Sequence, residues 1–138
     1  MKLSIKIHYG LQAILVLALN YESGAVQIRD IAKSQQIPPR FLEQILLIMK
    51  KGGLLVSLRG MKGGYALAKH PSDINLLDVI QVLEGPIELA SKRMKKIPVL
   101  YAMMDGVQSR LVDLLKEVTV EDLVIKKRQR DRAYVYNI

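Results

Sequence analysis

The chain contains no cysteine among its 138 residues. This absence excludes a disulfide framework, thiolate zinc sites and an ordinary cysteine-ligated iron–sulfur cluster, and it fits a reducing compartment. No apolar run approaches the roughly 18 residues that a membrane span requires. The apolar stretch at residues 11–19 is interrupted by Gln12 and is not followed by a clean signal-peptidase site. We therefore expect a cytoplasmic protein whose stability depends on packing.

Signatures of catalysis are also scarce. The glycines form no P-loop, because no Gly-Lys-Ser/Thr follows at the required spacing, and no G-x-G-x-x-G follows a strand. Two histidines are the only imidazole bases, and His70 with Ser72 is too local an arrangement to suggest a triad. We therefore expect that the protein is not an enzyme.

Basic residues are concentrated in the first half of the chain, so the net charge of +8 is uneven. Residues 1–70 contain ten Lys or Arg side chains and three acidic ones, whereas residues 71–138 contain eleven and ten. A basic half joined to a balanced half indicates that one part meets a polyanion and that the other has a different role. Nucleic acid is the first candidate partner, and an anionic membrane surface is the second.

Apolar residues recur at helical spacing in three successive stretches of the first half. The spacing predicts helices over residues 4–21 and 27–36. A third helix is expected to start near Pro39, because the residue before a proline avoids the helical region and proline suits a first helical turn. It runs to Lys51, where Gly52 and Gly53 supply a left-handed cap.

Polarity alternates in the next stretch, as it does in β-strands, at Leu55 and Ser57 and again at Tyr65 and Leu67. A tip of five or six residues that contains three glycines closes the predicted hairpin. Glycine suits such a tip because it tolerates positive φ and close backbone approach. The order is therefore helix, helix, break, helix, hairpin.

The second half begins with a fourth helix, capped by Asn75 with Asp78 and ended by Gly85 and Pro86. A polar, basic connector follows. After it, seven apolar residues alternate at spacings of three and four and predict a helical seam. These residues are Ile97, Leu100, Met104, Val107, Leu111, Leu114 and Val118. Thr119 with Asp122 is typical of the cap of a last helix.

This order is typical of a winged helix-turn-helix. Two short helices are joined by a break, and the second, which is the longer one, is followed by a glycine-rich cationic hairpin. The predicted fold is mainly α with a small β-hairpin, and a long C-terminal dimerisation helix follows the winged domain. We expect the winged domain over residues 1–83, a connector over 84–96, the dimerisation helix and final helix over 97–132, and a tail over 133–138.

The major groove of B-DNA, about 12 Å wide, admits one helix, and cations beside that helix bind phosphate. Arginine can bond guanine, glutamine can pair with adenine, and glutamate can accept from cytosine. Cations on a glycine-rich tip reach into or across a minor groove, where negative potential is concentrated. The candidate DNA-binding residues are Arg40, Glu43, Gln44, Lys50 and Lys51 on the third helix, and Arg59 and Lys62 on the hairpin tip.

Several stretches resemble the iron–sulfur cluster regulator and cysteine-metabolism repressor family of bacterial winged-helix transcription regulators. They are "MKLSIKIHYGLQAILVLA", "IRDIAKSQQIPPRFLEQIL", "KGGLLVSLRGMKGGYALAK", "INLLDVIQVLEGP" and "VTVEDLV", in the family's order and spacing. The pairing of "LEQIL" with "RGMKGGYALA" is the most specific part. The resemblance implies a homodimer that binds a pseudo-palindromic promoter site, often as a repressor. It also implies base reading from Arg40, Glu43 and Gln44, and a minor-groove contact by Arg59.

The chain departs from the family in two places. Arg40 replaces the small residue usual at its position, so the preferred site is expected to differ. The connector "IELASKRMKKIPVLYAMMDG" lacks the three cysteines with which many relatives hold an iron–sulfur cluster. We therefore expect no cofactor and no metal. His8 could bind a metal in an atypical cluster, but a histidine at a helix surface is more often solvated.

Three alternatives stay open at this stage. The seam could pack within one chain instead of between two chains. The basic surface could serve a winged-helix module that binds a protein or an anionic surface without reading DNA sequence. The basic run over residues 126–132 could contact phosphate or be a solvated tail.

We expect a homodimeric, sequence-specific transcription regulator that binds double-stranded DNA as a repressor. We expect no membrane partner. The connector could respond to an effector whose identity the sequence does not indicate.

Overall fold

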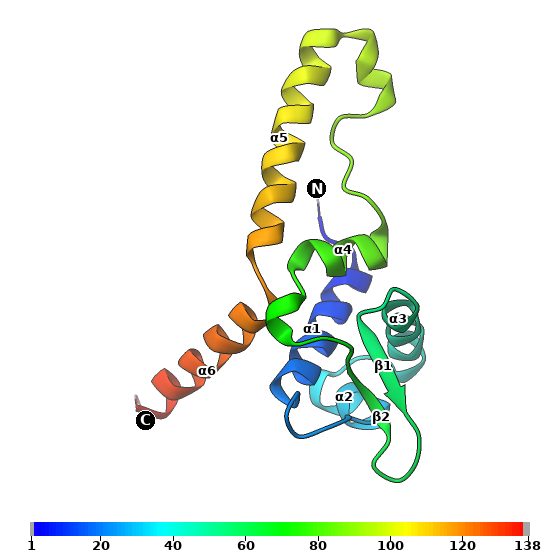
Figure 1. Cartoon of the computed structure of the whole chain (residues 1–138), viewed down its shortest axis with the longest axis vertical. Coiled ribbons are helices and arrows are strands. Elements are labelled where there is room, and N and C mark those ends of the chain that lie inside the picture. The colour runs from blue at the N-terminus through cyan, green and yellow to red at the C-terminus, as the bar shows by residue number, and fades with distance from the viewer. Residues whose placement is uncertain (1, 137–138) are drawn as a thin grey trace.

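The computed structural model describes residues 2–136. Its elements, in chain order, are α1 (Ile5–Leu19), α2 (Ile28–Gln35), α3 (Pro39–Lys51), β1 (Leu55–Leu58), β2 (Gly64–Leu67), the 3-10 turn η1 (Pro71–Asp73), α4 (Leu76–Glu84), the 3-10 turn η2 (Lys92–Lys96), α5 (Pro98–Glu117) and α6 (Val120–Tyr136). Figure 1 shows α1 to α4 and the hairpin gathered into one body, from which α5 rises as a long arm. The predicted mainly helical fold with a small hairpin is confirmed.

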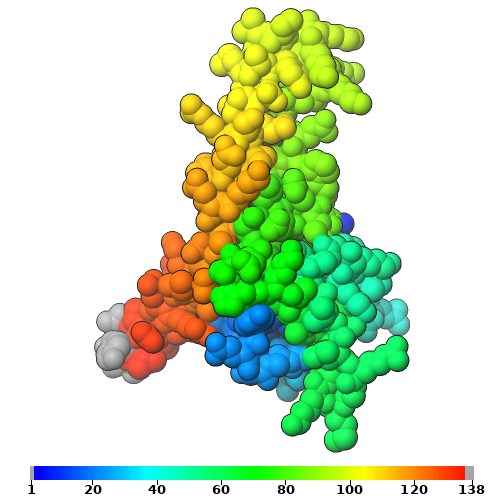
Figure 2. Space-filling view, in the orientation of Figure 1, coloured from blue at the N-terminus to red at the C-terminus, as the bar shows by residue number. Residues whose placement is uncertain are grey.

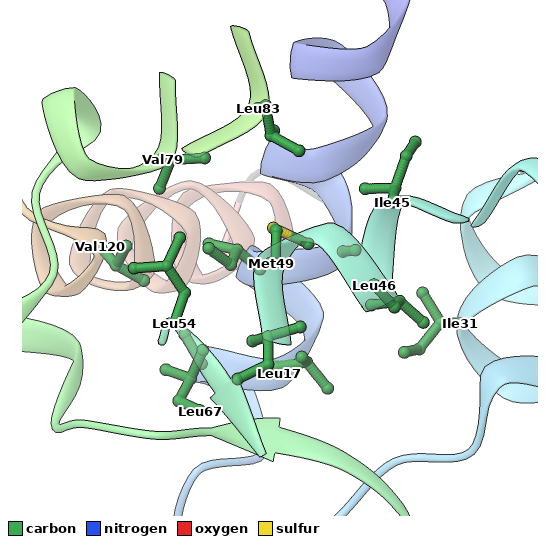
Figure 3. Packing of buried hydrophobic residues seen from close by; sticks show 14 of the residues in the cluster. Leu17, Ile31, Ile45, Leu46, Met49, Leu54, Leu67, Val79, Leu83 and Val120 are labelled. Carbon is green, nitrogen blue, oxygen red and sulfur yellow. The ribbon is translucent and has the colours of Figure 1, made fainter. Parts of the chain in front are cut away.

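One hydrophobic core holds the body together. It is formed by the inward faces of α1, α3 and α4 with one or two residues from each of α2, β1, β2 and α6. Figure 3 shows part of this cluster. Burying a large apolar side chain contributes about 1.5–3 kcal/mol. The largest fully buried side chains are Ile14, Leu17, Ile31, Leu42, Ile45, Leu46, Met49, Ile74, Val79 and Val120.

The first two helices are shorter than predicted, and their caps explain why. α1 starts after Ser4, whose hydroxyl accepts from the Ile7 N–H at 3.3 Å. α2 ends before Gln36, which has a left-handed φ of 54°. The end of α3 also differs in detail, because Gly52 keeps a φ of −78° and the positive φ of 82° lies at Gly53.

Both predicted caps in the second half are confirmed as reciprocal capping boxes. In α4, the Asn75 side chain accepts from the Asp78 N–H at 2.9 Å, and the Asp78 carboxylate accepts from the Asn75 N–H at 3.1 Å. In α6, Thr119 and Asp122 exchange the same pair of bonds at 3.1 and 2.9 Å. α6 then continues through Tyr136, so residues 133–136, expected as a tail, are helical. The remaining two residues of that expected tail lie outside the described chain.

The chain returns to the body after α5, which the sequence patterns did not indicate. The Leu76 N–H donates to the Val118 carbonyl at 2.9 Å, and the Val120 N–H donates to the Ile74 carbonyl at 2.8 Å. Val120 is fully buried and Val124 nearly so. The first turns of α6 therefore belong to the core of the winged body, whereas the predicted boundaries placed them with the dimerisation segment.

The connector lies beside α5 and is held there by side-chain contacts. The Gln108 amide oxygen accepts from the N–H groups of Leu89 and Ala90 at 2.7 and 3.0 Å. The ammonium of Lys95 lies 5.6 Å from the centre of the Tyr101 ring, within the range of a cation–π interaction. These contacts fold the connector and η2 back along the arm (Figure 1).

α5 buries no residue in the single chain, although it is the longest helix described. Figure 2 shows the arm projecting from the body, and the hairpin tip protruding from the opposite end of the molecule. Within residues 2–136, no helix is both long and apolar enough to cross a membrane.

Gly64 allows the hairpin backbone to lie close against the loop between α1 and α2. Its φ is +137°, and an added Cβ would collide with the Val26 carbonyl. Gly64→Ala should therefore destabilise the fold by about 2–4 kcal/mol, measured by urea unfolding with circular dichroism. Gly24, with a φ of +104° and open space around it, is the matched control. Gly24→Ala should cost about 1–2 kcal/mol, and equal losses for the two variants would contradict the collision.

Candidate nucleic-acid interface

The orientation of α3 is set by its buried face. Leu42, Ile45, Leu46 and Met49 are buried at the spacing of one side of a helix, so the other side must face solvent. That exposed side carries four of the predicted DNA-binding residues. They are Arg40, Glu43, Gln44 and Lys51, all exposed.

Leu47 is a residue of this exposed side that the sequence reasoning missed. It is 44% exposed and follows Gln44 by three positions and Glu43 by four. Residues three and four apart are neighbours on a helix surface, so this spacing could have identified it. An exposed aliphatic side chain between polar ones can contact the methyl group of thymine.

Lys50 differs from the other predicted α3 residues because its side chain bonds to the hairpin. Its ammonium donates to the Ser57 hydroxyl on β1 at 2.7 Å. Because of this bond, Lys50 links the end of α3 to the hairpin. Its predicted role at phosphate stays a prediction.

The hairpin has the predicted strands and a tip of five residues. β1 and β2 pair antiparallel, with Leu55 opposite Leu67 and Leu58 opposite Gly64. Arg59 and Lys62 are both exposed at the tip. α3 packs against β1, and Figure 1 shows the hairpin beside α3, with its tip extending away from the body.

The hairpin is also anchored to the segment before α2. Val26 and Tyr65 exchange two backbone hydrogen bonds, each 2.8 Å long. The Gln27 side-chain amide donates to the Met61 carbonyl at 3.3 Å, and the Arg29 guanidinium donates to the Gln27 amide oxygen at 3.2 Å. Gln27 and Arg29 are therefore two further polar residues beside the tip that the sequence reasoning missed, because their proximity depends on this tertiary contact.

The charge of this region is largely uncompensated. The ion pairs in the described residues are Arg29 with Asp30 and Lys127 with Asp131. None of the five predicted cations at the interface takes part in either pair. Unpaired cations around a protruding helix face and hairpin form a surface suited to a polyanion.

The seven predicted seam residues lie along the arm and contribute no buried side chain to this chain's core. Four of them are exposed, namely Ile97, Leu100, Val107 and Leu114. The other three, Met104, Leu111 and Val118, are half-buried. Val118 follows the last residue of α5, so the helical part of the seam ends at Leu114. Contiguous exposed apolar side chains on one helix mark an interaction surface.

The chain has few side chains that could ligate a metal ion or an iron–sulfur cluster. The chain has no thiolate ligand, and the described residues contain no group of three or more His, Cys, Asp or Glu side chains that could hold a metal ion. His8 is exposed on α1, with its ring 6.0 Å from that of Tyr9. His70 lies in the loop before η1, and its Nδ1 accepts from the Ser72 N–H at 3.1 Å. The residues present do not fit a cysteine-ligated cluster.

Comparison with known proteins gives consistent results. The model of the Rrf2 family, described as an iron-dependent transcriptional regulator, matches residues 3–126. The HTH-type transcriptional regulator CymR of Bacillus subtilis is 31% identical over 138 residues, which cover all of both chains. The HTH-type transcriptional regulator IscR of Cronobacter sakazakii is 31% identical over 97% of this chain and 91% of its own.

A solved structure shares the fold. T. potens IscR aligns with a TM-score of 0.76 and 34% identity, over 92% of this chain and 88% of that one. The chain therefore belongs to the Rrf2 family of winged-helix, DNA-binding transcriptional regulators.

Proposed function

We propose that this protein acts as a homodimeric repressor that binds a pseudo-palindromic promoter site. The single observation that supports this most directly is that the chain has two exposed surfaces of different character. One is the polar side of α3 beside the cationic hairpin tip, and the other is the apolar side of α5 at the far end of the body. The first surface suits a duplex, and the second suits an identical helix.

In this proposal, α3 enters the major groove and reads bases with Arg40, Glu43 and Gln44. Their side chains are exposed and belong to the first half of α3, the part of a recognition helix that reaches base edges. Lys50 and Lys51 bind phosphate at the end of the helix. Leu47, between the two groups, contacts an apolar part of a base.

Dimerisation through α5 would place two α3 helices about a two-fold axis. Half-sites would then be read in successive major grooves, about 34–36 Å apart. Each hairpin would reach the adjacent minor groove with Arg59 and Lys62. Occupancy of such a site occludes the promoter, which is the mechanism we propose for repression.

We further propose that this regulator works without a cysteine-ligated cluster. Thiolates are the usual cluster ligands, and the chain has none. Any signal would then come from another effector, whose chemistry the described residues do not specify. The connector, which Gln108 holds against α5, is the segment through which we propose that such a signal acts.

Base reading is tested by a pair of variants on α3. Gln44→Ala should relax preference at one base pair, with a loss of about 1–3 kcal/mol of discrimination. Lys51→Ala should instead weaken binding to all sequences and reduce the slope of log affinity against log salt by about one. Fluorescence anisotropy with selected and scrambled operators at several salt concentrations measures both. Unchanged DNA binding in both variants would favour a module that binds a protein or an anionic surface.

Dimerisation is tested at Leu114, which is 60% exposed and so can change without disturbing the body. Leu114→Asp should convert the dimer to a monomer in sedimentation equilibrium, because two carboxylates would meet at the seam. Operator affinity should fall at least about tenfold, since two linked sites bind more tightly than one. Ser109→Asp, exposed on the opposite side of α5, should leave both quantities unchanged. A wild-type monomer at micromolar concentration would refute the dimer.

The absence of a cluster is tested on protein purified anaerobically. Iron should be substoichiometric, and the visible charge-transfer absorption of an iron–sulfur centre should be absent. His8→Ala should leave the spectrum unchanged. Visible absorption that disappears in His8→Ala would instead establish an atypical cluster with histidine as a ligand.

A further inference from the structure

The hairpin tip carries an apolar side chain that no contact in the described structure covers. Met61 is 97% exposed, whereas no other large hydrophobic residue between positions 2 and 136 is recorded above the 73% of Val99. Single exposed hydrophobic residues are ordinary on protein surfaces, so the exposure alone indicates little. The surroundings of Met61 are more informative.

The backbone that carries Met61 is held in a defined shape. The Gly63 N–H donates to the Gly60 carbonyl at 2.9 Å, so that residues 60–63 form a closed turn with Met61 at its first central position. Gly60 has a φ of +106°, and a Cβ at Gly63 would collide with the Leu58 carbonyl. The Gln27 amide donates to the Met61 carbonyl at 3.3 Å. The Met61 side chain therefore projects from a preformed support.

The charges around Met61 match the shape of a minor groove. Arg59 lies two positions before it and Lys62 directly after it, both exposed and outside the two ion pairs of the described residues. The minor groove is about 6 Å wide and is bordered by phosphates, with sugars and base edges between them. An apolar side chain flanked by cations complements that arrangement. Methionine is also unbranched and adaptable, so it fits a narrow space.

We propose that Met61 is a specificity-determining residue that presses against a base step in the minor groove while Arg59 and Lys62 hold the phosphates on either side. This inference rests on the proposed function. Apolar side chains that enter a minor groove partly unstack a base step and bend the duplex. Pyrimidine–purine steps such as TA unstack most readily. The operator therefore has a preferred TA or CA step under each hairpin tip, at a position that α3 does not read.

The test uses an operator selected with the wild-type protein. Hydroxyl-radical footprints of wild type and Arg59→Ala locate the minor-groove position that the tip protects. At that position, a TA step is compared with a stiff AA step, with 2-aminopurine fluorescence reporting unstacking. Wild type should prefer the TA step by about tenfold, comparable to the loss at one mismatched base pair. It should also raise the fluorescence of the probe.

Three variants distinguish insertion of Met61 at one base step from a contact that is the same for all sequences. Met61→Ala should lose the step preference and the fluorescence change, and Met61→Leu should keep both because it preserves apolar bulk. Val56→Ala, which removes exposed apolar surface from β1 away from the tip, should behave as wild type. The Gln44→Ala variant described above serves as a reference, because it should change base preference without changing the step preference.

Several results would overturn the inference while leaving the proposed function intact. One is a wild-type protein that binds its operator specifically but shows no step preference. Another is a Met61→Ala variant that weakens all sequences equally, which would make the side chain a general contact. A changed oligomeric state of Met61→Ala without DNA would place the tip at an interface between copies. Equal binding of selected and scrambled operators by wild type would instead refute the proposed function itself.

Discussion

The burial of one side of α3 is the interaction on which the rest of the structure depends. Leu42, Ile45, Leu46 and Met49 insert into the core between α1, α4 and the hairpin, and this fixes the rotation of the helix about its axis. A helix that rotated by one residue would expose part of this apolar set and withdraw Arg40 or Gln44 from solvent. The same packing that stabilises the body therefore determines which side chains a duplex would meet.

The hairpin is attached to the body by backbone hydrogen bonds as well as by side-chain packing. Val26 pairs with Tyr65, and Gly64 allows the two backbones to approach closely. Gln27 reaches the tip itself. A two-stranded hairpin is marginally stable in water when isolated, so these contacts explain how a short, glycine-rich tip keeps a defined position beside α3.

The arm formed by α5 is anchored in the body at one end and exposes apolar side chains along its length. Val120 anchors the chain after α5 in the core of the body, and Gln108 fastens the connector along the helix. Along α5, Leu100, Val107 and Leu114 stay exposed in the single chain. Any displacement of the arm would therefore act directly on residues that pack against α1 and α4, so the arm and α3 share one core.

Local patterns in the sequence were sufficient for the order of elements, the start of α3 at Pro39 and the caps at Asn75 and Thr119, because each depends on residues a few positions apart. They also identified which α3 residues would be polar and exposed, since helical periodicity separates the two sides. Only the tertiary structure decided that Val120 returns to the winged body, that Lys50 bonds Ser57, and that Gln27 and Arg29 lie beside the hairpin tip. These depend on contacts between residues that lie far apart in the chain or in different elements, and no local spacing encodes them.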